Sequence, residues 1–277
     1  MKIIKKKDKV VFAIILFTFL FVLISILFSK YKIIKLSTTK NYTVFRKNNY
    51  VLVKKTLFPK RNDLIVYVIE DKYFVSRCVA LPKDTVYCVN GKVFINKKRL
   101  NDKDFAQNIY RIIYYGEEQK DLIESNYQII EQQDNLNLKY VSITEKEKKQ
   151  IENYKLQITN SQIPSKFRNS EVFPKSFRYD WNENNYGPLV LPKTKDILVL
   201  NEQTYSLWKN TILEFEKKQI ERKKDNSIFV NTKKTGHYIF ENNYYYVLND
   251  QRWQLSDSRK FGPIAENCII GKIIAIF

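Results

Sequence analysis

Histidine is almost absent from this sequence, since the chain of 277 residues has only one, His237. A metal site built from several histidines is therefore excluded, and so is a Ser-His-Asp triad that would use any other histidine. Cysteine is also scarce: Cys78, Cys88 and Cys268 are far apart and form no CxxC motif, which argues against a zinc site. We predict that the protein uses neither a metal nor any other cofactor.

Two of the cysteines leave one alternative open. Cys78 and Cys88 lie on two strand-like runs joined by a turn, so a disulfide between them is geometrically conceivable. We expect buried free thiols instead.

Acidic residues are few, with 29 Asp and Glu against 48 Lys and Arg, which gives a formal net charge of +19. Such a balance can indicate a nucleic acid, an anionic membrane surface or acidic partners. However, Lys, Asn, Ile, Tyr and Phe are all abundant and share A/T-rich codons, so the base composition of the gene accounts for much of the lysine. We therefore predict no nucleic-acid partner.

Charge is missing altogether from Val10–Phe28, a run long enough to cross a ~30 Å hydrocarbon core as a helix. A signal peptide would have an apolar region of about 7–15 residues and a small-residue cleavage site. This run is longer, and SKYKIIK follows it with no A-x-A pattern. We predict an uncleaved single-pass anchor in the inner (plasma) membrane. Because lysines are more frequent before the run than after it, the N-terminus should be cytoplasmic and the main domain extracytoplasmic, in the periplasm if the cell has one.

Two regions rich in strand-forming residues flank a region of mixed character. Residues 31–100 contain short runs dense in Val, Ile, Tyr and Phe, and the Asn90-Gly91 pair between two of them favours a type I′ hairpin. Strand-like runs return in residues 228–277 and end in a buried strand. We predict a mainly β protein: a tail and anchor (1–30), a β core in two parts, and a mixed α/β insert or cap domain (101–227) between these parts.

The insert carries several local signals. The apolar residues of 122–130 have helical spacing, and Thr144 with Glu147 fits a capping box at the start of a second helix. Residues 156–190 are polar with three prolines and indicate an irregular connector. Asn201 precedes a third helix, and one face of that helix should pack in the core through Tyr205, Trp208, Ile212 and Phe215.

Three motifs, in order along the chain, resemble the boxes of a known family. RNDLIVY is similar to GD-I-V-V-F, FVSRCVALPKDTVYCVNG to K-R-V-I-G-L-P-G-D with its following hairpin, and NDQRWQLSDSRKFG to G-D-N-R-x-x-S-x-D-S-R-x-x-G. These are boxes of the bacterial type I signal peptidases, which are S26-type serine peptidases. The insert, with VFPKSFRYDWNENNYGPLVLPK, resembles the long-insert branch. The resemblance covers nearly the whole chain and implies the family's β core behind an N-terminal anchor.

The resemblance implies catalysis by a Ser/Lys dyad. In the family, a neutral, partly desolvated Lys amine takes the proton of the Ser hydroxyl, and a nearby hydroxyl helps to hold the oxyanion. This sequence departs at both dyad positions, because the nucleophile falls on Lys40 and the base on Ser76. The oxyanion hydroxyl falls on Thr38, and a gap in the alignment would bring Thr39 or Ser37 to the nucleophile position.

Some other positions of the family boxes are substituted in this sequence, and others are retained. The Ser that would steady the Lys falls on Leu255, the Gly that opens the last box is Asn249, and the Gly of the L-P-G-D turn is Lys83. The retained residues are Asp63, Arg77, Pro82, Asp84, Asp250, Arg252, Asp257, Ser258, Arg259 and Gly262. We interpret Arg77, Asp250, Asp257 and Arg259 as structural site residues. We expect Arg77 to pair with Asp257 and so to join the two halves of the core.

A retained scaffold with substituted reactive groups favours a pseudoenzyme. We expect a signal peptidase I-like membrane protein without catalysis that acts in protein secretion and binds preproteins, the translocon or an active signal peptidase. Whether it is an enzyme depends on Ser76 and Lys40. An active peptidase with a rearranged dyad is one alternative, using Ser76 with Lys40, or Thr39 or Ser37 with another base. A structural subunit of a membrane complex is another, and its insert should carry an exposed apolar patch.

Overall fold

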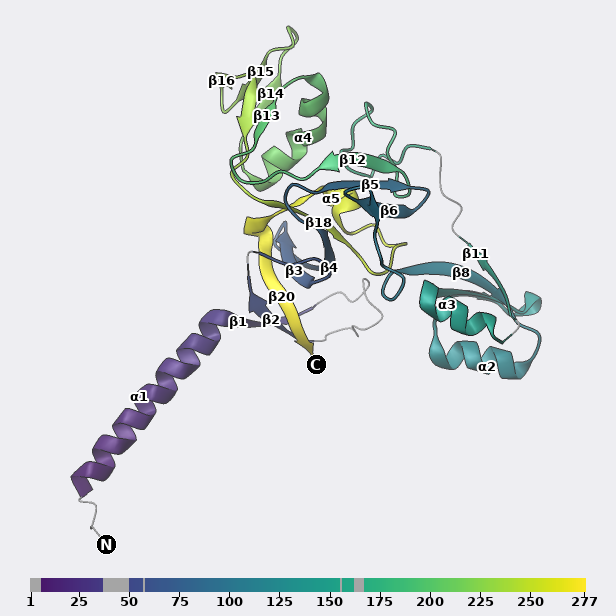
Figure 1. Ribbon diagram of the computed structural model, residues 1–277, viewed down its shortest axis with the longest axis horizontal. Helices are drawn as coiled ribbons and strands as arrows, with labels where there is room; N and C mark the ends of the chain where they lie inside the picture. The colour runs from purple at the N-terminus through teal and green to yellow at the C-terminus, as the bar shows by residue number, and fades with distance from the viewer. Residues whose placement is uncertain (1–5, 37–49, 57, 155, 162–166) are drawn as a thin grey trace.

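The computed structural model describes residues 6–36, 50–56, 58–154, 156–161 and 167–277. Helix α1 (Lys6–Lys30) projects from the rest of the molecule, as Figure 1 shows. Within the described residues, no helix combines the length and the apolar character that crossing a membrane requires. The anchor at Val10–Phe28 therefore stays a prediction.

The largest sheet has seven strands, in the order β1-β2-β20-β3-β4-β18-β19, and each neighbouring pair is antiparallel. Its strands are β1 (Tyr31–Lys35), β2 (Tyr50–Lys55), β3 (Leu64–Ile69), β4 (Lys72–Ala80), β18 (Tyr244–Leu248), β19 (Ile264–Ala265) and β20 (Ile269–Ile276). Strands from both sequence regions that are expected to form the β core thus share this sheet. Residues 228–239 do not join it, because their strands belong to other sheets. Short α5 (Ser258–Phe261) and η2 (Glu266–Cys268) flank β19 along the chain.

A second, smaller sheet has the order β12-β5-β6-β7. Its strands are β5 (Thr85–Val89), β6 (Lys92–Ile95), β7 (Lys98–Arg99) and β12 (Tyr186–Val190). Asn90 and Gly91 between β5 and β6 have φ of 50° and 76°, so the predicted hairpin is confirmed. One core cluster is lined by both sheets, and Cys78 and Cys88 lie buried in it as free thiols, as expected.

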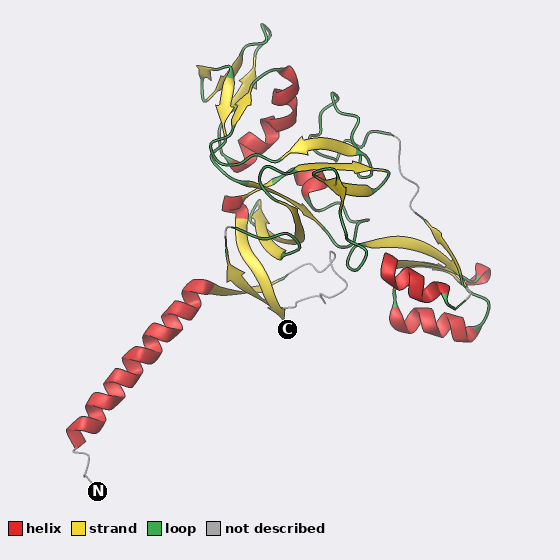
Figure 2. Cartoon of the chain, in the orientation of Figure 1, coloured by secondary structure: helices red, strands yellow, loops and turns green. Residues whose placement is uncertain are grey.

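The residues between the two halves of the β core form two lobes, which Figure 1 shows on different sides of it. The first lobe has its own core and a sheet of order β11-β8-β10-β9. Its elements are β8 (Gln107–Ile113), α2 (Glu117–Asn126), β9 (Gln128–Gln133), η1 (Asp134–Leu136), β10 (Leu138–Thr144), α3 (Glu145–Glu152) and β11 (Gln157–Asn160). Figure 2 shows its two helices lying next to each other.

The second lobe is continuous with the main core. It contains β13 (Ile197–Val199), α4 (Glu202–Phe215), β14 (Ile220–Arg222), β15 (Ile228–Val230), β16 (Lys233–Lys234) and β17 (His237–Ile239). Trp208, Ile212 and Phe215 of α4 are buried in the same cluster as β3, β4 and β18. The aromatic face predicted after Asn201 therefore packs in the core, as expected.

Of the elements predicted from the sequence of the insert, some are confirmed and others differ in the structure. The capping box of Thr144 and Glu147 is confirmed at the start of α3. The helix predicted over 122–130 was wrong beyond Asn126, because Tyr127 is already extended and Ile129 pairs with Val141 of β10. The connector predicted over 156–190 contains strands at both of its ends, β11 and β12.

Candidate functional site

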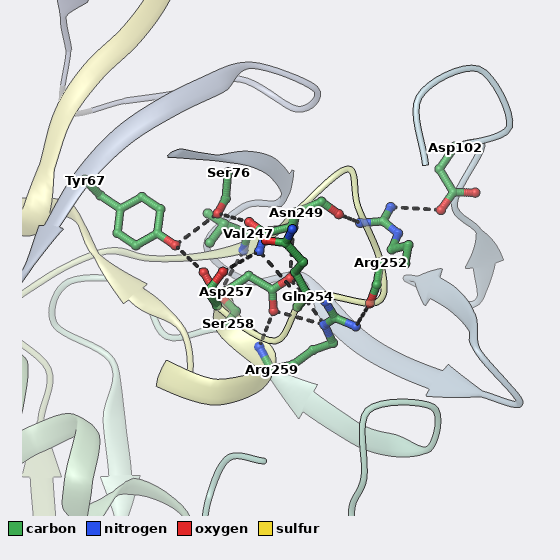
Figure 3. Close-up of polar contacts among 11 residues, drawn as sticks. Tyr67, Ser76, Asp102, Val247, Asn249, Arg252, Gln254, Asp257, Ser258 and Arg259 are labelled. Atoms are coloured by element: carbon green, nitrogen blue, oxygen red, sulfur yellow. Dashed lines mark hydrogen bonds and ion pairs between the residues drawn. The ribbon is translucent and has the colours of Figure 1, made fainter. Parts of the chain in front are cut away.

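Ser76 lies in the middle of β4 and is completely buried. Its hydroxyl donates to Oδ1 of Asn249 at 2.8 Å and lies 3.0 Å from the hydroxyl of Tyr67. Figure 3 shows these three side chains turned toward one another. The residue at the predicted base position is thus held inside a closed network of polar groups.

Asn249 follows β18 and is also fully buried. Its side-chain amide donates to Oγ of Ser256 at 2.8 Å, and its backbone N–H donates to Oδ2 of Asp257 at 2.9 Å. The resemblance places a glycine here, which would have no side chain. The carboxamide of Asn249 therefore takes up space next to position 76 that a glycine would leave open to a longer side chain on β4.

Asp257 anchors the end of the same loop. It is fully buried and accepts from the backbone N–H of Arg259 at 3.0 Å and from its Nη2 at 2.8 Å. Burial alone would lower the pKa of the Arg259 guanidinium, but the charge of Asp257 raises that pKa above its usual value. Arg259 also donates to the carbonyl oxygens of Arg252 and Gln254, so one ion pair fixes the path of the whole loop.

Arg77 has a different partner from the one predicted. Its Nε and Nη2 donate to Oδ1 and Oδ2 of Asp250 at 2.8 and 2.5 Å, while Asp257 pairs with Arg259. The choice of Asp257 was wrong because its carboxylate points toward its own loop. The expected consequence holds through Asp250, since this bidentate ion pair joins β4 to the loop that follows β18.

The predicted site is only partly described. Lys40 and Thr38, and the alternatives Thr39 and Ser37, lie outside the described residues. Tyr67 was not among the predicted site residues, although the strand pairing places it beside Ser76. In antiparallel β3 and β4, Ser76 pairs with Ile65, and side chains two residues apart share a face, so Tyr67 lies diagonally across from Ser76.

This arrangement gives Ser76 no general base among its described neighbours. The carboxamide of Asn249 does not titrate, and burial raises the pKa of Tyr67 far above its usual value, so its phenol stays protonated. No lysine or histidine of the described residues is hydrogen-bonded to Ser76. A serine hydroxyl without a base is a weak nucleophile, and this one is shielded from solvent.

Comparison with known proteins adds one finding to this geometry. A family model described as signal peptidase, peptidase S26, matches residues 6–167 and 190–277. Comparison with curated proteins gave no match. The matched residues include both halves of the β core and most of the two lobes, and residues 168–189 fall outside the match.

Proposed function

Because the chain belongs to the signal peptidase (peptidase S26) family, we propose that it is a membrane-anchored member that binds secretory preproteins without cleaving them. One observation carries this proposal: the hydrogen bond between Ser76 and Asn249 fills the position of the base with satisfied polar groups. Both residues differ from what the family boxes have there, and each supplies the partner of the other.

The rearranged dyad is disfavoured by the same contacts. A nucleophile must reach the scissile carbonyl, but Ser76 is fully buried and its proton is directed at Asn249. Lys40 would have to displace that contact before it could act as the base.

The proposal includes the membrane anchor. Among the described side chains of helix α1, ten large apolar ones are exposed, which water disfavours and a bilayer accommodates. They are Val11, Phe12, Ile14, Ile15, Leu16, Phe17, Phe19, Leu20, Phe21 and Val22. The lysine excess before the run supports a cytoplasmic N-terminus.

We expect opposite labelling of two introduced cysteines in cells treated with a membrane-impermeant maleimide. In a Cys268→Ser background, Lys224→Cys on the exposed surface of the second lobe should be labelled from outside, and Lys2→Cys should not. Both should be labelled after detergent is added, which is the control for reactivity. Labelling of the Lys2→Cys tail alone from outside would contradict this topology.

We expect the full-length chain in vesicles to bind a preprotein with an A-x-A site, saturably and without processing it. Binding is measured by site-specific crosslinking, and processing by a change in the length of the preprotein. The matched control is the same preprotein with two arginines in the apolar region of its signal sequence, which should not bind. Absence of any difference between the two preproteins would refute the binding role.

A structural role in a larger complex is favoured by one further observation. Ile197, Val199 and Ile239 are exposed on the same face of the β13–β17 ribbon, where Ile197 pairs directly with Ile239. The second lobe thus carries an exposed apolar patch, of which Ile197 and Val199 belong to the insert. If this role were the main one, Ile197→Lys with Ile239→Lys would release the chain from a larger assembly on a native gel and leave preprotein binding unchanged.

A further inference from the structure

The two lobes are joined to the β core in different ways. The second lobe shares the main core, because Trp208, Ile212 and Phe215 are buried in the same cluster as the strands of the main sheet. The first lobe has a core of its own within residues 110–158, and none of these residues belongs to the main cluster. Units that share no apolar core are expected to move relative to each other, so the first lobe has a freedom that the second lacks.

The first lobe contacts the β core at the loop that follows β18, through polar side chains. Trp253 Nε1 donates to Oγ of Ser142 in β10 at 3.2 Å. Gln251 Nε2 donates to Oε1 of Gln128 in β9 at 2.9 Å. Two neighbouring strands of the lobe sheet thus each accept one hydrogen bond from the loop.

The backbone of the loop is bound to the same lobe. Gln107, the first residue of β8, forms a parallel bridge with Gln251. Its N–H donates to the carbonyl oxygen of Asp250 at 2.7 Å, and its own carbonyl oxygen accepts from the N–H of Arg252 at 2.9 Å. Figure 3 shows the side chain of Arg252 reaching Asp102, which lies just before β8 and pairs with it at 2.9 Å.

The same loop holds the Ser76 network on its other side. Asn249 accepts the hydrogen bond of Ser76, and the next residue, Asp250, forms the ion pair with Arg77. The guanidinium of Arg77 also lies over the ring of Phe105, 4.2 Å from its centroid and two residues before β8. Residues 249–253 therefore connect β4 to the sheet of the first lobe.

We propose that the first lobe is a latch on this loop. In its docked position it holds Asn249 against Ser76, so the polar network stays closed. When the lobe moves away, the loop loses its anchors and Ser76 becomes accessible. A partner that binds the undocked lobe more tightly than the docked one would thus open the site from a distance. The latch does not require the preprotein-binding role, because its two positions differ only in contacts within this chain.

Alkylation of a cysteine placed at the site tests the latch. The starting chain is the full-length protein with Ser76→Cys and Cys268→Ser, and the test variant adds Gln128→Ala and Ser142→Ala. These two lobe residues bind the loop at positions other than 249. We expect iodoacetamide to modify position 76 about tenfold faster in the test variant, because two hydrogen bonds that hold the loop are lost. Mass mapping of peptides identifies the modified residue.

Two controls distinguish opening of the loop from unfolding. Cys78 lies two residues further along β4 and is buried in the main core, so its modification should be equally slow in both chains. The matched control variant carries Ser125→Ala and Gln150→Ala, which are the same two kinds of substitution at exposed positions of the first lobe. In this control, position 76 should be modified as slowly as in the starting chain.

Hydrogen exchange in the chain with native Ser76 provides a second measurement. Peptides from residues 249–257 should exchange about tenfold faster with Gln128→Ala and Ser142→Ala, while peptides from β3 and β20 exchange as in the native chain. The proposal is overturned if position 76 is modified no faster in the test variant, or if exchange of the loop is unchanged. It is equally overturned if Cys78, or β3 and β20, become accessible to the same extent, because the whole core would then have opened. None of these outcomes depends on preprotein binding.

Discussion

A variant that carries Lys40→Ser, Ser76→Lys, Leu255→Ser and Asn249→Gly should cleave an A-x-A preprotein, whereas the native chain should not. The first three changes restore the nucleophile, the base and the hydroxyl that steadies it, as the family boxes have them. The fourth removes the carboxamide that now lies against position 76. We expect this fourfold variant to exceed the threefold variant that keeps Asn249 by about 10²-fold or more, because a positioned general base typically contributes about 10²–10⁴ in rate.

The physical reason lies in the protonation state of the introduced lysine. Asn249 Oδ1 now accepts from the group at position 76 at 2.8 Å, and an amine there would donate to the same oxygen. A hydrogen bond donated by the charged ammonium favours that form, which raises the pKa and removes the base. With glycine at 249, this hydrogen bond is absent, so burial lowers the pKa of the lysine. Cleavage should therefore increase as the pH rises through that pKa.

Cleavage is followed by the appearance of the mature fragment from a preprotein, and circular dichroism checks that each variant is folded. The matched control is the fourfold variant with Ser76→Ala in place of Ser76→Lys, which should be inactive. Equal rates for the threefold and fourfold variants would show that Asn249 does not block the site. Robust cleavage by the native chain that disappears on Ser76→Ala would refute the silent role itself.

Asp257→Ala should lower the free energy of unfolding by about 3–5 kcal/mol, which is a large part of the stability of a typical domain. The substitution leaves the guanidinium of Arg259 buried without its carboxylate, and Arg259 is only 5% exposed. It also removes the acceptor for the backbone N–H of Asn249 and the N-cap of α5. Urea unfolding of the full-length chain in detergent, followed by tryptophan fluorescence, gives the change.

Two further variants test whether the loss of stability comes from the unpaired buried charge of Arg259. Asp257→Ala with Arg259→Met removes both charges, so it should recover part of the loss, since the unpaired ion is gone. Glu221→Ala, an exposed carboxylate, should change stability by no more than about 0.5 kcal/mol. A double variant as unstable as Asp257→Ala would mean that the ion pair is not what the loop depends on.

The sequence could predict those parts of the fold that depend on neighbours along the chain. The Asn90-Gly91 turn and the caps at Thr144 and Asn201 are local, because each joins residues only three positions apart along the chain. The shared sheet followed from the order of the family boxes. The end of α2 was missed because Ile129 and Ile130 fit a helical face as well as a strand, and only the pairing with β10 decides between them.

The side-chain partners within the site could not be predicted from the sequence. Asp250 and Asp257 lie in one loop and both could meet Arg77 on sequence grounds, but the path of the loop gives Arg77 the first and Arg259 the second. The contact of Ser76 with Asn249 joins residues 173 positions apart. The sequence alone shows that Ser76 and Asn249 replace the residues of the family boxes. That the two side chains form a hydrogen bond with each other is seen only in the structure.

The position of β20 between β2 and β3 constrains the order in which the chain can fold. Its partners β2 and β3 precede it by about 200 residues, and contacts at such a separation slow folding because a long loop must first be closed. Until β20 arrives, β2 and β3 each present an unpaired edge at which other strands can add. The middle of the main sheet is therefore its last part to be completed, and during synthesis its exposed edges are where misassembly and chaperone recognition would begin.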